Sequence, residues 1–147
     1  MGSREADSAA STAEMTRLAV TDAHALIWHA TGRERRLGRT ARAVFARADR
    51  GEATIYVPAL TLVEVSEAVL RGTFLDGGFS RWMRRLLASG RFAVADLSAE
   101  VILAAEELYA IPERGDRLIA ATAIAHDCPL ISRDPAFSRI PSLTTIW

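Results

Sequence analysis

The feature that most constrains the fold of this chain is the alternation of strand-like and helix-like segments after residue 16. Five short apolar runs have the length and composition of buried strands, and they cover residues 17–21, 53–57, 92–96, 129–132 and 143–147. Strands that alternate with helices favour a parallel sheet covered by helices on both faces. We therefore predict an α/β fold of three layers, α/β/α, with a central, mostly parallel sheet of about five strands.

Six helices are expected between these strands. Apolar residues recur at helical spacing around residues 26–28, 37–48, 62–69, 79–87, 101–108 and 116–126. Ser98 is a good amino-terminal cap for the helix that follows it, because a serine hydroxyl accepts a hydrogen bond from the first turn. The segment 79–87 carries Phe79, Trp82 and Met83, whose bulk fits either a core helix or a subunit interface.

The length of 147 residues fits one domain. Residues 1–16 are rich in Ser, Ala and acids and lack periodicity, which is typical of a disordered extension, so the folded domain is expected over 17–147. No apolar stretch approaches the ~20 residues of a membrane span, and the amino terminus lacks a hydrophobic signal core. We expect a soluble, cytoplasmic protein.

Several residue types are absent or rare, which excludes some chemistry. The chain has no lysine, asparagine or glutamine, so it has no P-loop lysine and no Schiff-base lysine. The single cysteine, Cys128, cannot form an internal disulfide, and its place before Pro129 and an apolar strand favours a buried structural thiol.

Four acids stand at or near predicted strand ends and helix starts. Two of them follow strands and two lie in the first turns of helices; they are Asp22, Glu64, Asp116 and Asp134. In a parallel sheet such positions gather at the carboxyl edge, where open α/β sheets bind their ligands. We therefore predict that the four acids form one site.

Each acid also has a structural explanation. Asp22 could cap the helix that follows it, and Asp134 could be a turn residue. Asp116 fits a helix start, where the helix dipole favours negative charge. Taken singly each acid is ambiguous, and the argument for a site depends on all four sharing one edge.

Other acids compete for the same role. Glu64 and Glu67 are three residues apart on one helix, so either side chain could point to the sheet edge. Asp96 ends the predicted middle strand, and Asp127 precedes the strand at 129–132. We interpret Asp96 as a cap and Asp127 as part of a helix-ending turn.

A cluster of carboxylates requires protons or a cation. Two carboxylates ~4 Å apart repel by roughly 4 kcal/mol at an effective dielectric constant near 20. Hard oxygen ligands favour Mg²⁺ or Mn²⁺, and the absence of His-x-x-x-His and Cys-x-x-Cys spacings argues against zinc. The predicted cofactor is Mg²⁺ (or Mn²⁺).

Four segments resemble the PIN-domain ribonucleases and, within them, the VapC toxins of toxin–antitoxin pairs. These segments run from Thr21 to Trp28, across Val63-Glu64, from Gly115 to Ala123 and from Leu130 to Asp134. The most specific part is Asp-Arg-Leu-Ile-Ala-Ala-Thr-Ala followed by a strand that ends in Ser-Arg-Asp. The similarity covers roughly residues 17–147.

The resemblance implies a PIN-like fold and metal-dependent endonucleolytic cleavage of RNA. It places the family's acids on the four positions named above and its hydroxyl residue, two before the fourth acid, on Ser132. The chain departs from many members at Ala23, where Thr or Ser follows the first acid. The resemblance further implies a homodimer and a small antitoxin partner, VapB-like, whose carboxyl-terminal segment occupies the acidic groove.

Arginines are concentrated in two segments although the formal net charge is zero. Seven arginines and two acids fall in residues 31–50, and four arginines with no acid fall in residues 81–91. Such local patches can guide a polyanion. The candidate RNA-binding residues are Arg33, Arg36, Arg39, Arg84 and Arg85, although a solvated helix face explains any single arginine as well.

Two rival functions also fit parts of the sequence. A degenerate PIN-like module that binds nucleic acid or protein without cutting finds its support in Ala23, and four intact acids argue against it. A haloacid-dehalogenase phosphatase needs Asp-x-Asp after the first strand and a lysine, whereas this chain has His24 at the third position and no lysine.

Overall fold

The computed structural model describes residues 4, 8 and 12–147. It contains one sheet in which all neighbouring strands are parallel, in the order β3-β2-β1-β4-β5. The strands are β1 (Leu18–Thr21), β2 (Thr54–Pro58), β3 (Phe92–Ala95), β4 (Leu130–Ile131) and β5 (Thr145–Ile146). All five predicted strands are therefore present, each within one or two residues of its expected ends.

The helices alternate with the strands along the chain. They are α2 (Ala23–Ala30), α3 (Arg39–Asp49), α4 (Ala59–Leu70), α5 (Gly78–Ala88), α6 (Ala99–Glu106) and α7 (Arg114–Ala125), with the short 3₁₀ helices η1 (Glu34–Arg36) and η2 (Phe137–Arg139). Ser98 caps α6 as predicted, because its hydroxyl accepts the Val101 N–H at 3.3 Å. The last helix begins two residues before Asp116, which therefore lies inside its first turn.

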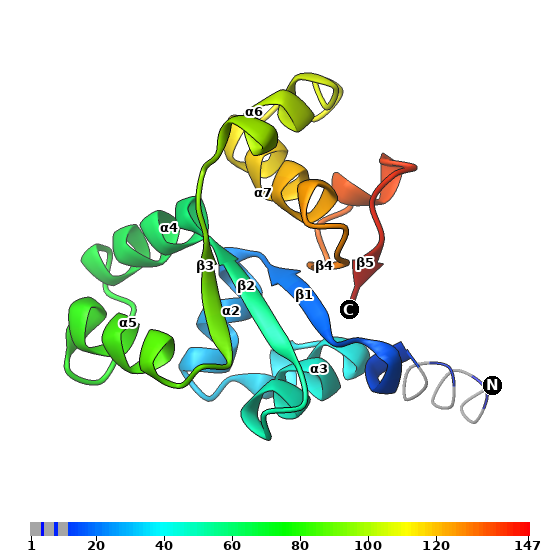
Figure 1. Ribbon diagram of the computed structural model, residues 1–147. Coiled ribbons are helices and arrows are strands. Elements are labelled where there is room, and N and C mark those ends of the chain that lie inside the picture. Colours follow the sequence, from blue (N-terminus) through cyan, green and yellow to red (C-terminus); the bar gives the residue numbers. More distant parts are fainter. Residues whose placement is uncertain (1–3, 5–7, 9–11) are drawn as a thin grey trace.

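The two faces of the sheet carry separate hydrophobic cores. Along β1, Ala19 faces the core made with α2, α3, α4 and α5, whereas Val20 faces the core made with α6 and α7. This alternation follows from the period of two in a strand. Figure 1 shows α6 and α7 on one side of the sheet and α2 and α3 on the other. The predicted three-layer α/β/α fold is confirmed.

Helix α5 belongs to the core. Trp82 is buried, and Phe79 and Met83 pack against the same core cluster. Of the two explanations open for this segment, its packing supports the core helix, so these side chains do not indicate a subunit interface.

The predicted disordered extension at residues 1–16 lies largely outside the described residues. Within that range residues 12–15 are helical, and Ala13 is buried against the core. No helix among the described residues is both long enough and apolar enough to cross a membrane.

The strand order places a topological switch point at the centre of the sheet. The chain passes outward from β1 through β2 to β3, and then crosses to β4 and β5 on the other side of β1. In open α/β sheets the loops that leave the carboxyl ends of such strands diverge and form a crevice. The carboxyl ends of β1 and β4 therefore mark the expected ligand site.

Candidate functional site

Ser132 links the first and the fourth acid at the switch point. Asp22 directly follows β1, and its Oδ1 accepts the Ala25 N–H at 2.9 Å as the amino-terminal cap of α2. The Ser132 hydroxyl is buried; it accepts the Asp134 N–H at 3.1 Å and acts as a hydrogen-bond donor to Asp22. Asp22 thus caps α2 and also lies near Ser132 and Asp134, so a capping role does not exclude a role in a site.

The second and third acids come from helices α4 and α7, which are in contact. The buried Thr61 hydroxyl in the first turn of α4 bonds to the Thr21 carbonyl oxygen at 3.4 Å, which holds α4 against the end of β1. Glu64, one turn later, is half-buried, whereas Glu67 is exposed. Of the two glutamates, Glu64 is the one that faces the other site acids.

Glu113 is a fifth acid at this edge. It caps α7, and its carboxylate accepts the N–H groups of Gly115 at 3.2 Å and of Asp116 at 3.3 Å. A methyl group added at Gly115 would lie 3.0 Å from Oε1 of Glu113 and 3.4 Å from Oε1 of Glu64. Gly115 therefore allows the two glutamates to approach the same point of the backbone.

The pKa is raised at three of the four predicted acids, Asp22, Glu64 and Asp116. The pKa of Asp116 rises to about 7, first because of burial, then because of Glu113, Asp134 and Glu64. The pKa of Glu64 is raised by burial and then by Glu113 and Asp22. Negative charge is therefore concentrated at this edge of the sheet.

Burial also dominates at Asp22. It raises the pKa of the carboxyl, and the charge of Asp134 raises it further. Hydrogen bonds from Ser132 and the Ala25 N–H, and the proximity of His24, act in the opposite direction. Electrostatic interactions thus connect the four predicted acids. The interacting pairs are Asp22 with Asp134, Asp22 with Glu64, Glu64 with Asp116, and Asp116 with Asp134.

The donor set fits a hard divalent cation by its chemistry. It consists of carboxylate and hydroxyl oxygens, which Mg²⁺ and Mn²⁺ prefer, and their mutual repulsion is relieved by a cation. As the side chains stand, no three His, Cys, Asp or Glu residues in the described part of the chain are arranged to hold one ion. An ion shared by three of these acids would require some of their side chains to turn toward it.

The other candidates lie at different positions. Asp96 is exposed after β3, and Asp127 is exposed in the turn after α7 with a φ of 50°. The candidate arginines are all exposed. Arg85 pairs with Asp76 at 3.8 Å, and Arg36 lies over the ring of Trp28, 6.0 Å from its centroid.

A pocket of about 360 Å³ adjoins Asp22 and Asp134, and His24 lines it, as its position two residues after Asp22 allows. Besides the two acids it is lined by His24, Trp28, Arg133, Pro135 and Trp147. The spacing of His24 and Trp28, four residues apart on one helix, was the signal for their shared face. Glu113 was missed because the helix was expected to start at Asp116, and nothing in the sequence indicated that Trp147 reaches this pocket.

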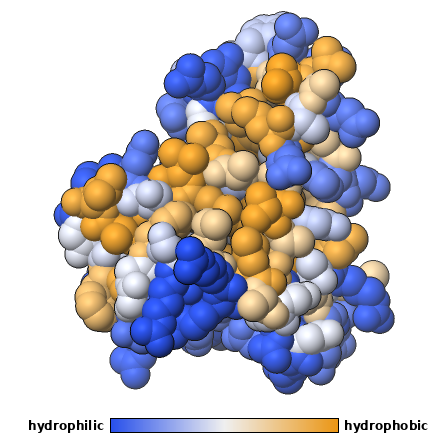
Figure 2. Space-filling model, turned by 60° about the vertical axis from the view of Figure 1, so that its left-hand side comes forward, coloured by the Kyte–Doolittle hydropathy of each residue, from blue (hydrophilic) through white to orange (hydrophobic). Residues whose placement is uncertain are grey.

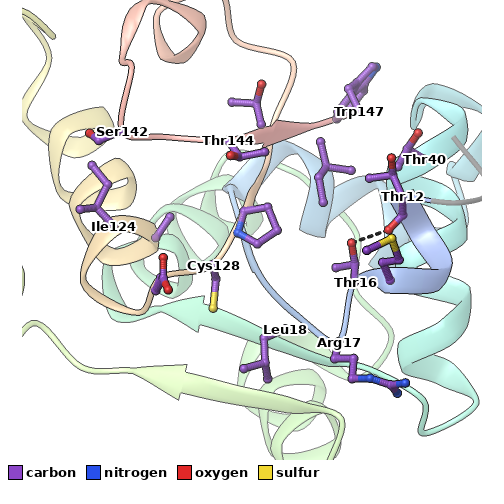
Figure 3. A pocket seen from close by; sticks show the side chains of 16 residues that line it. Thr12, Thr16, Arg17, Leu18, Thr40, Ile124, Cys128, Ser142, Thr144 and Trp147 are labelled. Atoms are coloured by element: carbon purple, nitrogen blue, oxygen red, sulfur yellow. Dashed lines mark hydrogen bonds between the residues drawn. The ribbon is translucent and has the colours of Figure 1, made fainter. Parts of the chain in front are cut away.

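A larger cavity lies elsewhere. It has a volume of about 960 Å³ and adjoins the amino ends of β1 and β4 and the edge strand β5. Figure 3 shows that threonine and serine hydroxyls, Cys128 and apolar side chains line it. None of the four predicted site acids lines this cavity.

Comparison with known proteins identifies the family. A sequence model of the PIN domain matches residues 19–143, which is most of the chain. The chain belongs to the PIN domain family. This PIN domain protein matched no curated protein in sequence.

Three solved structures share the fold of this PIN domain protein. VapBC2 from Rickettsia felis, bound to a promoter DNA fragment, has a TM-score of 0.68 at 21% identity and covers 88% of this chain and 98% of its own. A toxin–antitoxin complex from Klebsiella pneumoniae has 0.61 at 23%, with coverage of 86% and 96%. DNA-bound VapBC from Salmonella typhimurium has 0.60 at 16%, with coverage of 90% and 98%.

Proposed function

We propose that this PIN domain protein is a Mg²⁺- or Mn²⁺-dependent endoribonuclease, the VapC-type toxin of a type II toxin–antitoxin pair. The observation that carries the proposal is the set of four acids at the carboxyl edge, where burial and the neighbouring carboxylates raise the pKa of Asp22, Glu64 and Asp116. Perturbed carboxyl groups gathered at a ligand crevice are typical of functional sites. The fold shared with VapBC structures supports the same assignment.

In this proposal Asp22, Glu64, Asp116 and Asp134 hold the metal. A bound divalent cation supplies a water of lowered pKa and neutralises charge on the leaving oxygen. The chain's own contribution is positional. Ser132 fixes Asp22 relative to Asp134, and Ala23, which is buried, offers no hydroxyl beside the first acid.

The RNA backbone would be bound by exposed arginines, because phosphate contacts position a nucleic acid. The candidates remain Arg33, Arg36, Arg39, Arg84 and Arg85. Arg36 has the strongest support, since its guanidinium lies over the ring of Trp28, and Trp28 also lines the pocket beside the acids. Arg85 has the weakest, since it pairs with Asp76.

The proposed partners are a VapB-like antitoxin and a second copy of the chain, in the cytoplasm. The three structural neighbours are toxin–antitoxin complexes. Support for a homodimer comes from a band of hydrophobic residues on the face shown in Figure 2. Exposed apolar side chains of α4, α6 and the adjoining loops include Val63, Leu70, Phe74, Leu97, Ile102 and Leu103, and patches of this kind mark interfaces.

A second candidate function is a PIN-like module that binds nucleic acid or protein without cutting. It is favoured by Ala23 and by the finding that no three acids in the described residues are arranged to hold one ion. The two functions differ in a direct assay. Only the nuclease cleaves RNA when Mg²⁺ or Mn²⁺ is added.

Cleavage of a labelled single-stranded RNA pool by the purified protein tests the proposal. We expect cleavage with Mg²⁺ or Mn²⁺, none with excess chelator, and a loss of at least about 100-fold in Asp22→Asn and Asp116→Asn, because even outer-shell partners of a metal contribute 10- to 100-fold. Asp127→Asn is the matched control, since it makes the same change at the opposite edge and Asn tolerates a positive φ. Equal cleavage in chelator, or full activity in both site variants, would contradict the metal mechanism.

The toxin assignment is tested in cells. Expression of the chain alone is expected to slow growth, and co-expression of an adjacent small gene is expected to restore it. The Asp116→Asn variant should be harmless at the same protein level. Normal growth with soluble, metal-competent wild-type protein would favour the binding module.

A further inference from the structure

The pocket beside Asp22 and Asp134 has a composition that the metal chemistry does not explain. Acids occupy one part of it, and the rest is lined by His24, Trp28, Arg133 and Trp147. The indole rings of Trp28 and Trp147 and the guanidinium of Arg133 do not bind a divalent cation. They are groups on which planar bases stack.

Arg133 is held over two tryptophan rings. Its guanidinium carbon lies 4.9 Å from the centroid of Trp28 and 5.8 Å from that of Trp147. The two rings themselves meet edge to face, with centroids 5.8 Å apart. Trp28 is buried and Trp147 half-buried, whereas Arg133 is exposed.

The guanidinium has not been neutralised by the neighbouring acids. Asp134 is next to Arg133 in the chain and Asp22 lines the same pocket, yet among the described residues Arg133 forms no ion pair. Cation–π contact with two rings positions the charge without using up its N–H donors. These donors therefore remain available to a ligand that lies against the acids.

We propose that this pocket binds one nucleotide of single-stranded RNA next to the scissile bond, with its base stacked on the exposed guanidinium of Arg133 and a phosphate accepting the guanidinium N–H groups. The inference rests on the proposed function and adds a specificity-determining residue to it. Because Trp28 and Trp147 support the guanidinium from one side, the planar group, and not charge alone, is the recognition element.

The proposal predicts one result when the positive charge of Arg133 is lost and another when only its planar guanidinium is lost. Arg133→Ala removes both, and Arg133→Lys keeps the charge but cannot stack. Base stacking in single-strand binding is worth about 5- to 100-fold in affinity. Both variants should therefore bind more weakly than wild type by at least about 5-fold, and only Arg133→Ala should also reduce the salt slope, by about 0.7 for one single-strand contact.

The experiment measures binding without cleavage. A fluorescein-labelled single-stranded 2′-O-methyl oligonucleotide of mixed sequence is titrated with each protein in chelator, by anisotropy, at several salt concentrations. Arg17→Ala is the control; it removes an exposed arginine that directly precedes β1, at the opposite edge of the sheet, and should stay within about 2-fold of wild type. Thermal melts confirm that the exposed substitutions leave the fold intact.

The outcomes separate this inference from the proposed nuclease. Wild-type affinity in Arg133→Ala, or in Arg133→Lys, overturns the stacking subsite even if the protein cleaves RNA. Weakened binding in both, together with no cleavage by wild type in Mg²⁺, supports the subsite and contradicts the enzyme. Normal oligonucleotide binding with lost inhibition by the antitoxin overturns the subsite and assigns Arg133 to the partner protein.

Discussion

The two edges of the sheet offer a ligand different things. At the carboxyl edge, the pocket of about 360 Å³ brings two of the four acids together with His24 and Arg133. At the amino edge, the cavity of about 960 Å³ is lined mainly by threonines and apolar groups, with Arg17 and Asp127 as its charged residues. The larger space thus has the less reactive lining. Site assignment in this fold therefore depends on side-chain chemistry more than on volume.

Helix direction explains why acids gather at one edge. In a parallel sheet, each helix that leads back to the next strand begins at the carboxyl edge, so its unpaired N–H groups and positive dipole end lie there. Asp22 accepts one of these N–H groups at the start of α2, and Glu113 does the same at the start of α7. Helices end at the amino edge, where the negative end of the helix dipole would disfavour the same acids.

The largest effect expected from this difference is stabilisation by metal. A ligand at 100 times its Kd adds about 2.7 kcal/mol to the unfolding free energy, which corresponds to a rise in Tm of about 5–10 °C for a domain of this size. Mg²⁺ or Mn²⁺ should produce this rise in wild type and in Asp127→Asn, and not in Asp116→Asn. Differential scanning calorimetry measures it, and an equal rise in Asp116→Asn would remove the carboxyl edge as the metal site.

A second, smaller effect is the pH dependence of the metal-free protein. The pKa of Asp116 is about 7 in the folded protein against an ordinary value of 3.8. Below about pH 4 the carboxyl is protonated in both states; as pH rises to 7 only the unfolded state releases the proton, so stability falls and then levels off. Asp116→Asn should therefore raise Tm at pH 8, by about 2–4 °C if solvent screening leaves about 1 kcal/mol.

The same variant should have almost no effect on Tm at pH 4, because wild type then carries no charge at Asp116. Asp127→Asn serves again as the reference, since its effect should not grow with pH. A gain in Asp116→Asn that is equal at pH 4 and pH 8 would show that packing, and not the cost of ionising the carboxyl, causes it.

The sequence was sufficient to predict the layers and the gathering of the four acids at one edge of the sheet. Alternating apolar runs determined five strands, because a buried parallel strand needs a continuous apolar segment. Strand ends then placed Asp22 and Asp134 at one edge. Helix periodicity left Glu64 and Glu67 equivalent. The family resemblance selected Glu64, and the packing of α4 against β1 through Thr61 agrees with that choice.

The missed residues depend on contacts between distant segments. Trp147 directly follows β5. The pairing of β5 with β4 brings Trp147 against Trp28 and therefore into the pocket. Arg133 lies between two expected site residues, but its contact with two rings cannot be read from local spacing. Glu113 was missed by an error of two residues in a helix start, which is the range in which helix ends are hardest to place.

The smallest expected effect concerns Cys128, which lines the amino-edge cavity. Burial raises the pKa of its thiol, so little thiolate is present at neutral pH, and its Sγ contacts the His126 carbonyl oxygen at 3.1 Å. Reaction with a small thiol reagent such as methyl methanethiosulfonate should be slow, and the modified protein should cleave RNA within about 2-fold of the unmodified one, in line with surface changes far from a site. Mass spectrometry gives the extent of modification, and the RNA assay gives the activity of the same sample. A large loss of cleavage in folded, modified protein would show that the amino-edge cavity takes part in the function and that the contrast between the two edges is wrong.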